Sequence, residues 1–305
     1  MYIGVNVKLA SGLIILLLFL FSSCDEAIVL DDGDNYITVN PAAGSNFTYA
    51  SFGLHLPETE NLRGIVVIVP GYNSDGIYYK DDEVFQDLAS VQNVAVISCF
   101  YQGDSEMHEY YNAEGGSGKA LLRAIEEFAY RADRPELENL PLLFWGHSAG
   151  GMFSLSFMNW RPDLVAGVAA IRTPIYNAEV KDSSFAIPTM FLLGENDDVE
   201  LNDSCISYCT ENRNKGALWS YAIEPLIGHS IGDADYLSLP FLIKVLTRRV
   251  GMVNLSEDSG WLGDYSTLQI NSYSSYEGIK PNAAWLPDEY IAELWQKYQR
   301  GDFTY

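Results

Sequence analysis

Residues 142–151 read Leu-Leu-Phe-Trp-Gly-His-Ser-Ala-Gly-Gly, an apolar run followed at once by a Gly-x-Ser-x-Gly motif. The next seven residues, 152–158, have the composition of a buried helix. A strand, a sharp turn that carries a serine, and a helix are the context in which such a serine serves as a nucleophile. Gly146 and Gly150 have a physical reason there, because the strand and the helix must pass close together around a strained turn. The stretch therefore predicts a nucleophile at Ser148.

Apolar segments typical of buried parallel strands recur along the chain. They lie at residues 64–69, 94–100, 142–145, 164–171, 189–193 and 219–223. Helical segments alternate with them, at residues 117–131, 152–158 and 236–250. This alternation predicts an α/β protein with a mostly parallel central sheet and helices on both of its faces. Residues 36–39 and 47–56 alternate apolar and polar positions, and we expect them to form antiparallel strands at one edge.

The length and apolar content fit one large domain, spanning residues 36–305. The connection between the strands 164–171 and 189–193 is too short for a large lid. Residues 251–305 form a C-terminal extension, rich in Ser, Tyr and Asn, that lies beyond the alternating pattern. Pro287 and the acids that follow it predict a final helix. Its aromatic side chains either pack on the domain or help to wall a substrate cleft.

A serine is an effective nucleophile only beside a base that accepts its proton. The chain has four histidines. His55 lies on an early strand, and His108 precedes Ser148, against the order Ser, acid, His of this motif. His147 is next to the serine, where its side chain is expected to point away from the reacting face. His229 remains: it follows a strand, in a glycine-flanked loop, and is the predicted base.

The base in turn needs a carboxylate that fixes its tautomer and stabilises the imidazolium. We expect this acid between Ser148 and His229, at the carboxyl end of a strand. The strand 189–193 is followed by Gly-Glu-Asn-Asp-Asp, and Asp197 is the predicted acid. Asp198 is the alternative, whereas Glu195 is too close to the strand. A calcium site built from these acids is a weaker interpretation.

The negative charge that develops on a carbonyl oxygen during attack needs two N–H donors. The N–H of Ala149 is one candidate, because it follows the nucleophile at a helix N-terminus. The second should come from the loop after the strand 64–69, which reads Pro-Gly-Tyr. The Tyr72 N–H is the predicted donor, and Gly71 lets the backbone turn toward the site.

The N-terminal residues have the pattern of an export signal. Lys8 precedes the apolar run 13–21, which is too short for an ordinary transmembrane helix, and two serines lead into Cys24. Small residues directly before a cysteine resemble a bacterial lipobox. On that resemblance residues 1–23 are a signal peptide, and Cys24 carries the lipid that anchors an exported protein to a membrane or the cell surface. The alternative is a plain secretory signal, with Cys24 incidental.

Residues 24–35 are acidic and polar and are expected to form a solvated tether. The acids there do not have the spacing of a calcium loop. The whole chain carries 41 acidic and 18 basic side chains, a formal net charge of −23. Such a chain is a poor partner for nucleic acid or for an anionic bilayer surface. We therefore expect membrane association only through the lipid on Cys24, and the pattern does not predict an oligomeric state.

Three further cysteines follow in the chain. Cys99 ends an apolar strand and is expected to be a buried free thiol. A disulfide between Cys205 and Cys209 is compatible with an exported protein. The spacing Cys-Ile-Ser-Tyr-Cys, without a nearby histidine, does not fit a metal site. We expect neither a metal nor another cofactor.

Taken together, Ser148, Asp197, His229 and the Pro70-Gly71-Tyr72 loop resemble the α/β-hydrolase superfamily of serine esterases over roughly residues 64–249. The short connection and the His-Ser-Ala-Gly-Gly elbow further resemble polyhydroxybutyrate-depolymerase-like and feruloyl or acetyl-xylan esterase-like enzymes. Many relatives have His-Gly where this chain has Pro-Gly, which leaves the backbone donor intact. The resemblance implies an α/β-hydrolase fold.

The predicted reaction is two-step acyl transfer on a carboxylic ester. Abundant aromatic residues, 20 Tyr and 6 Trp, favour esterified polysaccharide or aryl and short-chain esters as substrates. A serine peptidase or a lipase is an alternative activity. A catalytically silent protein on the same fold, which binds carbohydrate or another ligand, is the alternative of a different class.

Overall fold

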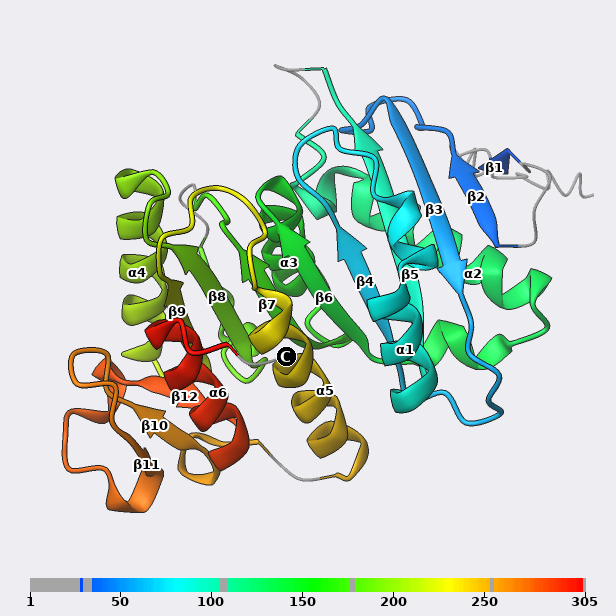
Figure 1. Ribbon diagram of the computed structural model, residues 1–305. Helices are drawn as coiled ribbons and strands as arrows, with labels where there is room; N and C mark the ends of the chain where they lie inside the picture. Colours follow the sequence, from blue (N-terminus) through cyan, green and yellow to red (C-terminus); the bar gives the residue numbers. More distant parts are fainter. Residues whose placement is uncertain (1–27, 30–34, 105–108, 176–178, 253–254, 304–305) are drawn as a thin grey trace, which may run out of the picture.

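The computed structural model describes residues 28–29, 35–104, 109–175, 179–252 and 255–303. Within them, nine strands form one central sheet (Figure 1). From edge to edge these are β1 (Ile28–Val29), β2 (Tyr36–Val39), β3 (Tyr49–His55), β5 (Val94–Gln102), β4 (Gly64–Val69), β6 (Leu142–His147), β7 (Val165–Ile171), β8 (Thr189–Gly194) and β9 (Trp219–Glu224). The pairs from β5 to β9 are parallel, and the pairs from β1 to β5 are antiparallel.

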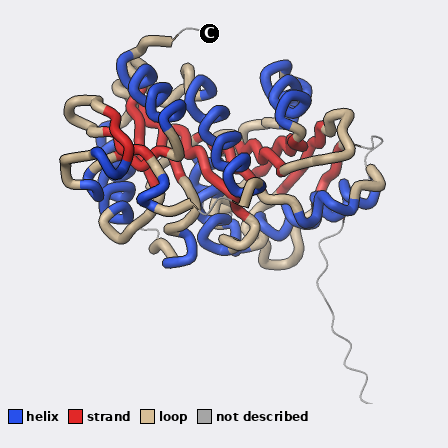
Figure 2. The backbone as a smooth tube through the Cα atoms, turned by 90° about the horizontal axis from the view of Figure 1, so that it is seen from below, coloured by secondary structure: helices blue, strands red, loops and turns tan. Residues whose placement is uncertain are grey.

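Helices cover both faces of this sheet (Figure 2). They are α1 (Glu83–Gln92), α2 (Ser117–Arg131), α3 (Ala149–Trp160), α4 (Val199–Arg213), α5 (Asp235–Val250) and α6 (Glu289–Arg300). Side chains of α2, α3 and α4 share one core, and those of α1, α5 and α6 share the other. Strand β4 explains the division, because Ile65 and Val67 enter the first core whereas Val66 and Ile68 enter the second. The chain is an α/β protein with a large, mostly parallel sheet, as predicted.

The predicted strands and helices are present, but two helices were not anticipated. Asp82 is the N-cap of helix α1, and its carboxylate accepts the Val84 N–H at 2.9 Å. Helix α4 has polar or charged residues on most of its length and buries only a few side chains, among them Tyr208. A helix with so narrow a buried stripe has little of the apolar periodicity from which helices are predicted.

The C-terminal extension packs on the domain. It contains a second sheet of β11 (Ile270–Ser272), β10 (Trp261–Gly263) and β12 (Ala284–Leu286), followed by α6, beside β9 in Figure 1. Trp295 of α6 is fully buried, and its Nε1–H donates to the Tyr221 carbonyl of β9 at 2.7 Å. The ring of Tyr265 stacks on that of Tyr221, with 3.7 Å between centroids. Of the two expectations for the aromatic face, packing on the domain describes these residues.

Two predictions concern the N-terminal region. The signal peptide 1–23 and Cys24 lie outside the described residues. Within the predicted tether, Ile28 and Val29 form β1, which pairs with Val39 and Thr38 of β2. Without β1, the backbone N–H and C=O groups along the outer edge of β2 would lack partners within the sheet, and β1 supplies partners for them. Among the described helices, none is long and apolar enough to cross a membrane.

The cysteines of α4 are not joined. Cys205 and Cys209 are buried free thiols, like Cys99. One turn of helix separates them, and at that spacing the two Cβ atoms are roughly 5–6 Å apart, too far for a disulfide. The Cys205 thiol instead donates to the Thr173 carbonyl at 2.8 Å. The suggested disulfide is therefore wrong, because the sequence did not reveal that the pair lies on a helix.

Candidate active site

Ser148 lies at the turn between β6 and α3, with φ of 53° and ψ of −120°. Its N–H donates to the Ile171 carbonyl at the end of β7, at 2.8 Å. The neighbouring glycines leave no room for side chains. A Cβ on Gly150 would overlap the Val69 carbonyl, and one on Gly146 would overlap the Gly150 carbonyl. Strand and helix therefore approach closely enough to hold the serine in a conformation that side chains rarely adopt.

Three of the predicted side chains lie in one hydrogen-bonded line. The His229 Nε2 lies 2.9 Å from the Ser148 Oγ, and the Nδ1 lies 2.9 Å from the Asp197 Oδ2. Because a carboxylate only accepts, Nδ1 carries the proton, and Nε2 accepts from the serine hydroxyl. The Asp197 side chain is 3% exposed, whereas that of His229 is 44% exposed. The arrangement pairs a shielded acid with a histidine that solvent and a ligand can reach.

The three acids after β8 have separate contacts. Asp197 faces His229, and its Oδ1 also accepts the Asp198 N–H at 2.8 Å. Asp198 is the N-cap of α4, where its Oδ1 accepts the Glu200 N–H at 2.8 Å. Glu195 accepts the N–H of Leu226 at 2.8 Å and so joins its loop to the loop of His229. Of the two candidates for the acid, the structure brings Asp197 and not Asp198 to the histidine.

Backbone contacts hold the acid loop against the histidine loop. The Asn196 N–H donates to the Ile227 carbonyl at 2.8 Å. A Cβ on Gly194 would lie 2.6 Å from the carbonyl oxygens of Ile227 and Gly228, closer than real Cβ atoms come. Glycine at the end of β8 thus lets the two loops touch, which sets the distance between Asp197 and His229.

The two predicted backbone donors border the serine. Ala149 is the first residue of α3, so its N–H has no partner within the helix. A Cβ on Gly71 would lie 3.6 Å from the Ser148 Cβ, which places the loop that contains Tyr72 beside Ser148. Within the described residues, neither the Tyr72 nor the Ala149 N–H donates to another group. Both N–H groups therefore belong to segments that lie next to Ser148.

His147 was expected to point away from the site, and this expectation is wrong. Its ring centroid lies 5.5 Å from that of His229, and its Nε2–H donates to the His229 carbonyl at 3.3 Å. Burial, with the neighbouring His229 next in importance, lowers the pKa of His147 to about 4. His147 is the last residue of β6, and it continues the face on which Leu143 and Trp145 enter the core shared with α5. The loop of His229 leads into α5 on that same face, so the two histidines meet. His147 therefore holds the loop of His229 through this hydrogen bond.

His147 gives the fold a pH dependence. The folded state binds its proton near pH 4, whereas the group normally binds it near 6.5. Between these values the unfolded state holds more protons, so the stabilisation contributed by neutral His147 is lost as the pH falls. We expect the free energy of unfolding to drop by about 2 kcal/mol more in the wild type than in a His147→Gln variant between pH 7 and pH 4.5. Urea titrations at both pH values measure this difference, and equal drops would contradict it.

A cleft of about 610 Å³ runs along the outer side of α3. Met152 is the first residue of α3 that lines the cleft. It lies one helical turn from Ser148, and its N–H donates to the Ser148 carbonyl at 3.3 Å. The lining combines apolar and acidic side chains, among them Leu155, Trp160, Ile175, Glu109 and Glu179. The cleft therefore offers apolar contact area that begins one helical turn from Ser148, with three glutamates and Lys181 in its lining. None of the predicted site residues lines it.

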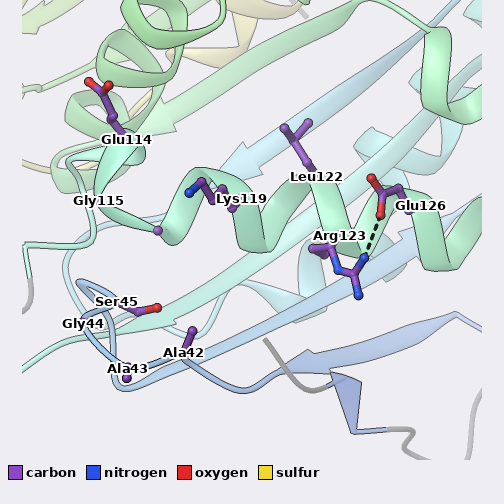
Figure 3. Close-up of a pocket in the computed structure, with 11 residues that line it drawn as sticks. Ala42, Ala43, Gly44, Ser45, Glu114, Gly115, Lys119, Leu122, Arg123 and Glu126 are labelled. Atoms are coloured by element: carbon purple, nitrogen blue, oxygen red, sulfur yellow. Dashed lines mark hydrogen bonds and ion pairs between the residues drawn. The ribbon is translucent and has the colours of Figure 1, made fainter. Parts of the chain in front are cut away.

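A second cavity, of about 480 Å³, lies between residues 42–45 and α2 (Figure 3). It borders the first at Glu114, which lines both. Its own lining is more polar, and Figure 3 shows Lys119, Arg123 and Glu126 along α2, with Arg123 paired to Glu126 at 3.3 Å. No predicted site residue lines this cavity. Among the described residues, no cluster of His, Cys, Asp or Glu could hold a metal ion.

Comparisons with known proteins add little to this geometry. No family model and no curated protein matches the chain. Among solved structures, a protein named ferulic acid esterase matches with a TM-score of 0.48 and 14% sequence identity, over 72% of this chain and 98% of that one. At this identity and TM-score the similarity assigns no activity to the chain.

Proposed function

We propose that this chain is a serine hydrolase of the α/β-hydrolase type that cleaves carboxylic esters through an acyl-enzyme. The observation that carries the proposal is the line from Ser148 Oγ through His229 to Asp197, with both hydrogen bonds at 2.9 Å. The chain order Ser, Asp, His and the strand-turn-helix around the serine support the fold type. The strained backbone of Ser148 supports a functional role, since such strain clusters at active sites.

In the first step, the Ser148 Oγ attacks the ester carbonyl carbon, and His229 Nε2 takes the hydroxyl proton. The carbonyl oxygen becomes an oxyanion that accepts the N–H groups of Tyr72 and Ala149. The N-terminal end of α3 adds its positive dipole at the same place. When the carbonyl re-forms, the bond to the alcohol oxygen breaks, and the alcohol leaves with the proton from His229.

In the second step, water replaces the alcohol. His229 takes a proton from the water as its oxygen attacks the acyl carbon, and the oxyanion is held by the same two N–H groups. Collapse breaks the bond between the acyl carbon and Ser148, which recovers its proton from His229. Asp197 keeps the proton on Nδ1 in the resting state and stabilises the imidazolium in each step.

For the substrate, we propose a neutral ester whose larger part lies in the cleft along α3, as in decorated polysaccharides or aryl esters. Apolar walls formed by Met152, Trp160 and Ile175 support a bulky uncharged group, and Glu109 and Glu179 disfavour an anionic one. A screen of acetylated and feruloylated oligosaccharides beside aryl esters identifies the class. Faster hydrolysis of an anionic aryl ester than of its uncharged analogue of equal size would contradict the proposal.

Labelling with a fluorophosphonate tests the reaction type. The probe phosphonylates a serine only when a base activates it, so we expect one adduct, at Ser148, located by peptide mass spectrometry. The His229→Ala variant is the matched control and should label far more slowly. Absence of an adduct in the folded wild type would favour the silent binding protein. Cleavage of amides as fast as of matched esters would favour a peptidase.

We also propose that the protein is exported and anchored through a lipid on Cys24. The support is the sequence alone, with a basic residue, a short apolar run and small residues directly before the cysteine. Expression in a bacterium with an alkyne fatty acid should label the wild type and not a Cys24→Ser variant. Equal labelling of the two would contradict the anchor.

A further inference from the structure

A buried ionic cluster lies beneath the histidine loop. Arg172 follows β7, Glu224 ends β9, and Tyr298 belongs to α6, so three distant parts of the chain meet there. All three are buried, with exposures of 0%, 1% and 0%. An Arg172 Nη2–H donates to the Glu224 Oε2, and the Tyr298 hydroxyl donates to the same oxygen at 2.6 Å. A buried charge pair needs such additional hydrogen bonds, because desolvation otherwise exceeds the attraction.

Tyr298 is the part of this cluster that the C-terminal extension supplies. Its hydroxyl donates to Glu224 and accepts an Arg172 Nη1–H at 3.3 Å, so it joins both members of the ion pair. Burial raises the pKa of Tyr298 well above its usual range, which keeps the proton available for Glu224. The ring of Phe303 packs against it, with 5.5 Å between centroids.

The other carboxylate oxygen of Glu224 holds the histidine loop. The Glu224 Oε1 accepts the Asp233 N–H at 2.9 Å, four residues after His229. Gly232 has a φ of +57°, and a Cβ there would lie 2.5 Å from the same oxygen. The loop therefore rests directly on the carboxylate, at a glycine where no side chain fits. The Tyr298 hydroxyl thus donates to one oxygen of Glu224, and the loop of His229, the proposed base, donates to the other through the Asp233 N–H.

The same cluster also borders the nucleophile. The residue before Arg172, Ile171, accepts the Ser148 N–H through its carbonyl. Arg172 has a φ of 48°, an uncommon value for a residue other than glycine, and its N–H donates to the Leu192 carbonyl at 2.8 Å. Arg172 is thus fixed at its backbone beside Ser148 and at its guanidinium beneath the loop of His229.

We propose that Tyr298 is a positioning residue, through which the C-terminal extension fixes the distance from His229 to Ser148 by orienting Glu224. The proposal rests on the proposed function, because it assigns His229 the role of base. It also makes the extension a component of the proposed active site. Among the described residues, the hydrogen bonds of the His229 ring are to Asp197 and Ser148 and not to the extension. Loss of the Tyr298 hydroxyl removes one of the two donors to the Glu224 Oε2 and leaves the contact from Arg172. The carboxylate, and with it the loop bonded to its other oxygen, is then oriented less firmly.

The test compares Tyr298→Phe with Tyr290→Phe, a matched change on the same helix at a side chain that is 53% exposed. We expect Tyr298→Phe to lower kcat on 4-nitrophenyl acetate about tenfold with KM unchanged, because small displacements of a catalytic group slow chemistry more than binding. Rates are normalised to the fraction of protein labelled by fluorophosphonate at completion. Hydrogen exchange, measured by mass spectrometry, should rise in residues 225–234. The Tyr290→Phe variant should match the wild type in both measurements.

A second pair of variants perturbs the same contact, between Glu224 and the histidine loop, by a change in the loop. Gly232→Ala places a methyl against Glu224, whereas Gly216→Ala, also at positive φ, meets no atom within 4 Å. Gly232→Ala should reproduce the kcat loss, and Gly216→Ala should not. Wild-type kcat per labelled protein in both Tyr298→Phe and Gly232→Ala would overturn the proposal and leave the hydrolase intact. A folded wild type that neither labels nor hydrolyses esters would overturn the proposed function instead, and the exchange comparison would then decide whether Tyr298 holds the loop.

Discussion

Replacement of Ser148 by alanine is expected to reduce kcat for ester hydrolysis by a factor on the order of 10⁵ to 10⁶. The variant lacks the atom that forms the acyl-enzyme, so only the oxyanion donors and substrate binding remain. KM should change little, because the hydroxyl contributes to the transition state rather than to binding of the ester. Steady-state rates on 4-nitrophenyl acetate, with enzyme purified from a host that lacks background esterase, measure the effect.

The same variant should fold as the wild type does. The Ser148 side chain caps no helix, and its hydrogen bond is to the half-exposed His229. Alanine has the same backbone restrictions at a φ of 53°, so the strain of the turn is retained. Thermal unfolding therefore controls for structure. Retention of more than a hundredth of the wild-type kcat in a folded variant would refute Ser148 as the nucleophile.

Much of the site could be predicted because its parts lie in short stretches with strong local constraints. The parallel strands are apolar on both faces, and the carboxyl ends of neighbouring parallel strands meet at one edge of the sheet. A serine after β6, an acid after β8 and a histidine after β9 therefore come together without knowledge of any long-range contact. The stretches around Ser148 and Asp197 also carry glycines where two backbone segments touch.

The remainder depends on contacts that no local pattern records. Tyr298 and Glu224 are 74 positions apart, and each reads by itself as an ordinary aromatic or acidic residue. A disulfide between Cys205 and Cys209 was compatible with the sequence only because α4 is too polar to be recognised as a helix from its pattern. The sequence favoured Asp197 and left Asp198 as the alternative. What the sequence did not show is that the Asp198 carboxylate caps α4, whereas that of Asp197 faces His229.

Replacement of Asp197 by asparagine is expected to lower kcat about 10⁴-fold with the fold intact. The Asp198 N–H donates to the Asp197 Oδ1, so the amide oxygen of asparagine takes that side, and its NH₂ takes the side of His229 Nδ1. An NH₂ only donates, which forces the imidazole proton from Nδ1 to Nε2. With Nε2 protonated, His229 no longer accepts the proton of Ser148. The reaction therefore slows although the geometry is unchanged.

Asp198→Asn is the matched control for this prediction. Asparagine caps helices about as well as aspartate, so the contact to the Glu200 N–H persists and α4 keeps its start. The control should retain wild-type kcat, and an Asp198→Ala variant should lose about 1 kcal/mol of stability without loss of kcat. Steady-state kinetics and urea unfolding of the three variants separate a tautomer effect from a capping effect. If Asp198→Asn were the inactive variant, Asp198 would be the acid, and the hydrogen bonds seen at His229 would not be those of the working enzyme.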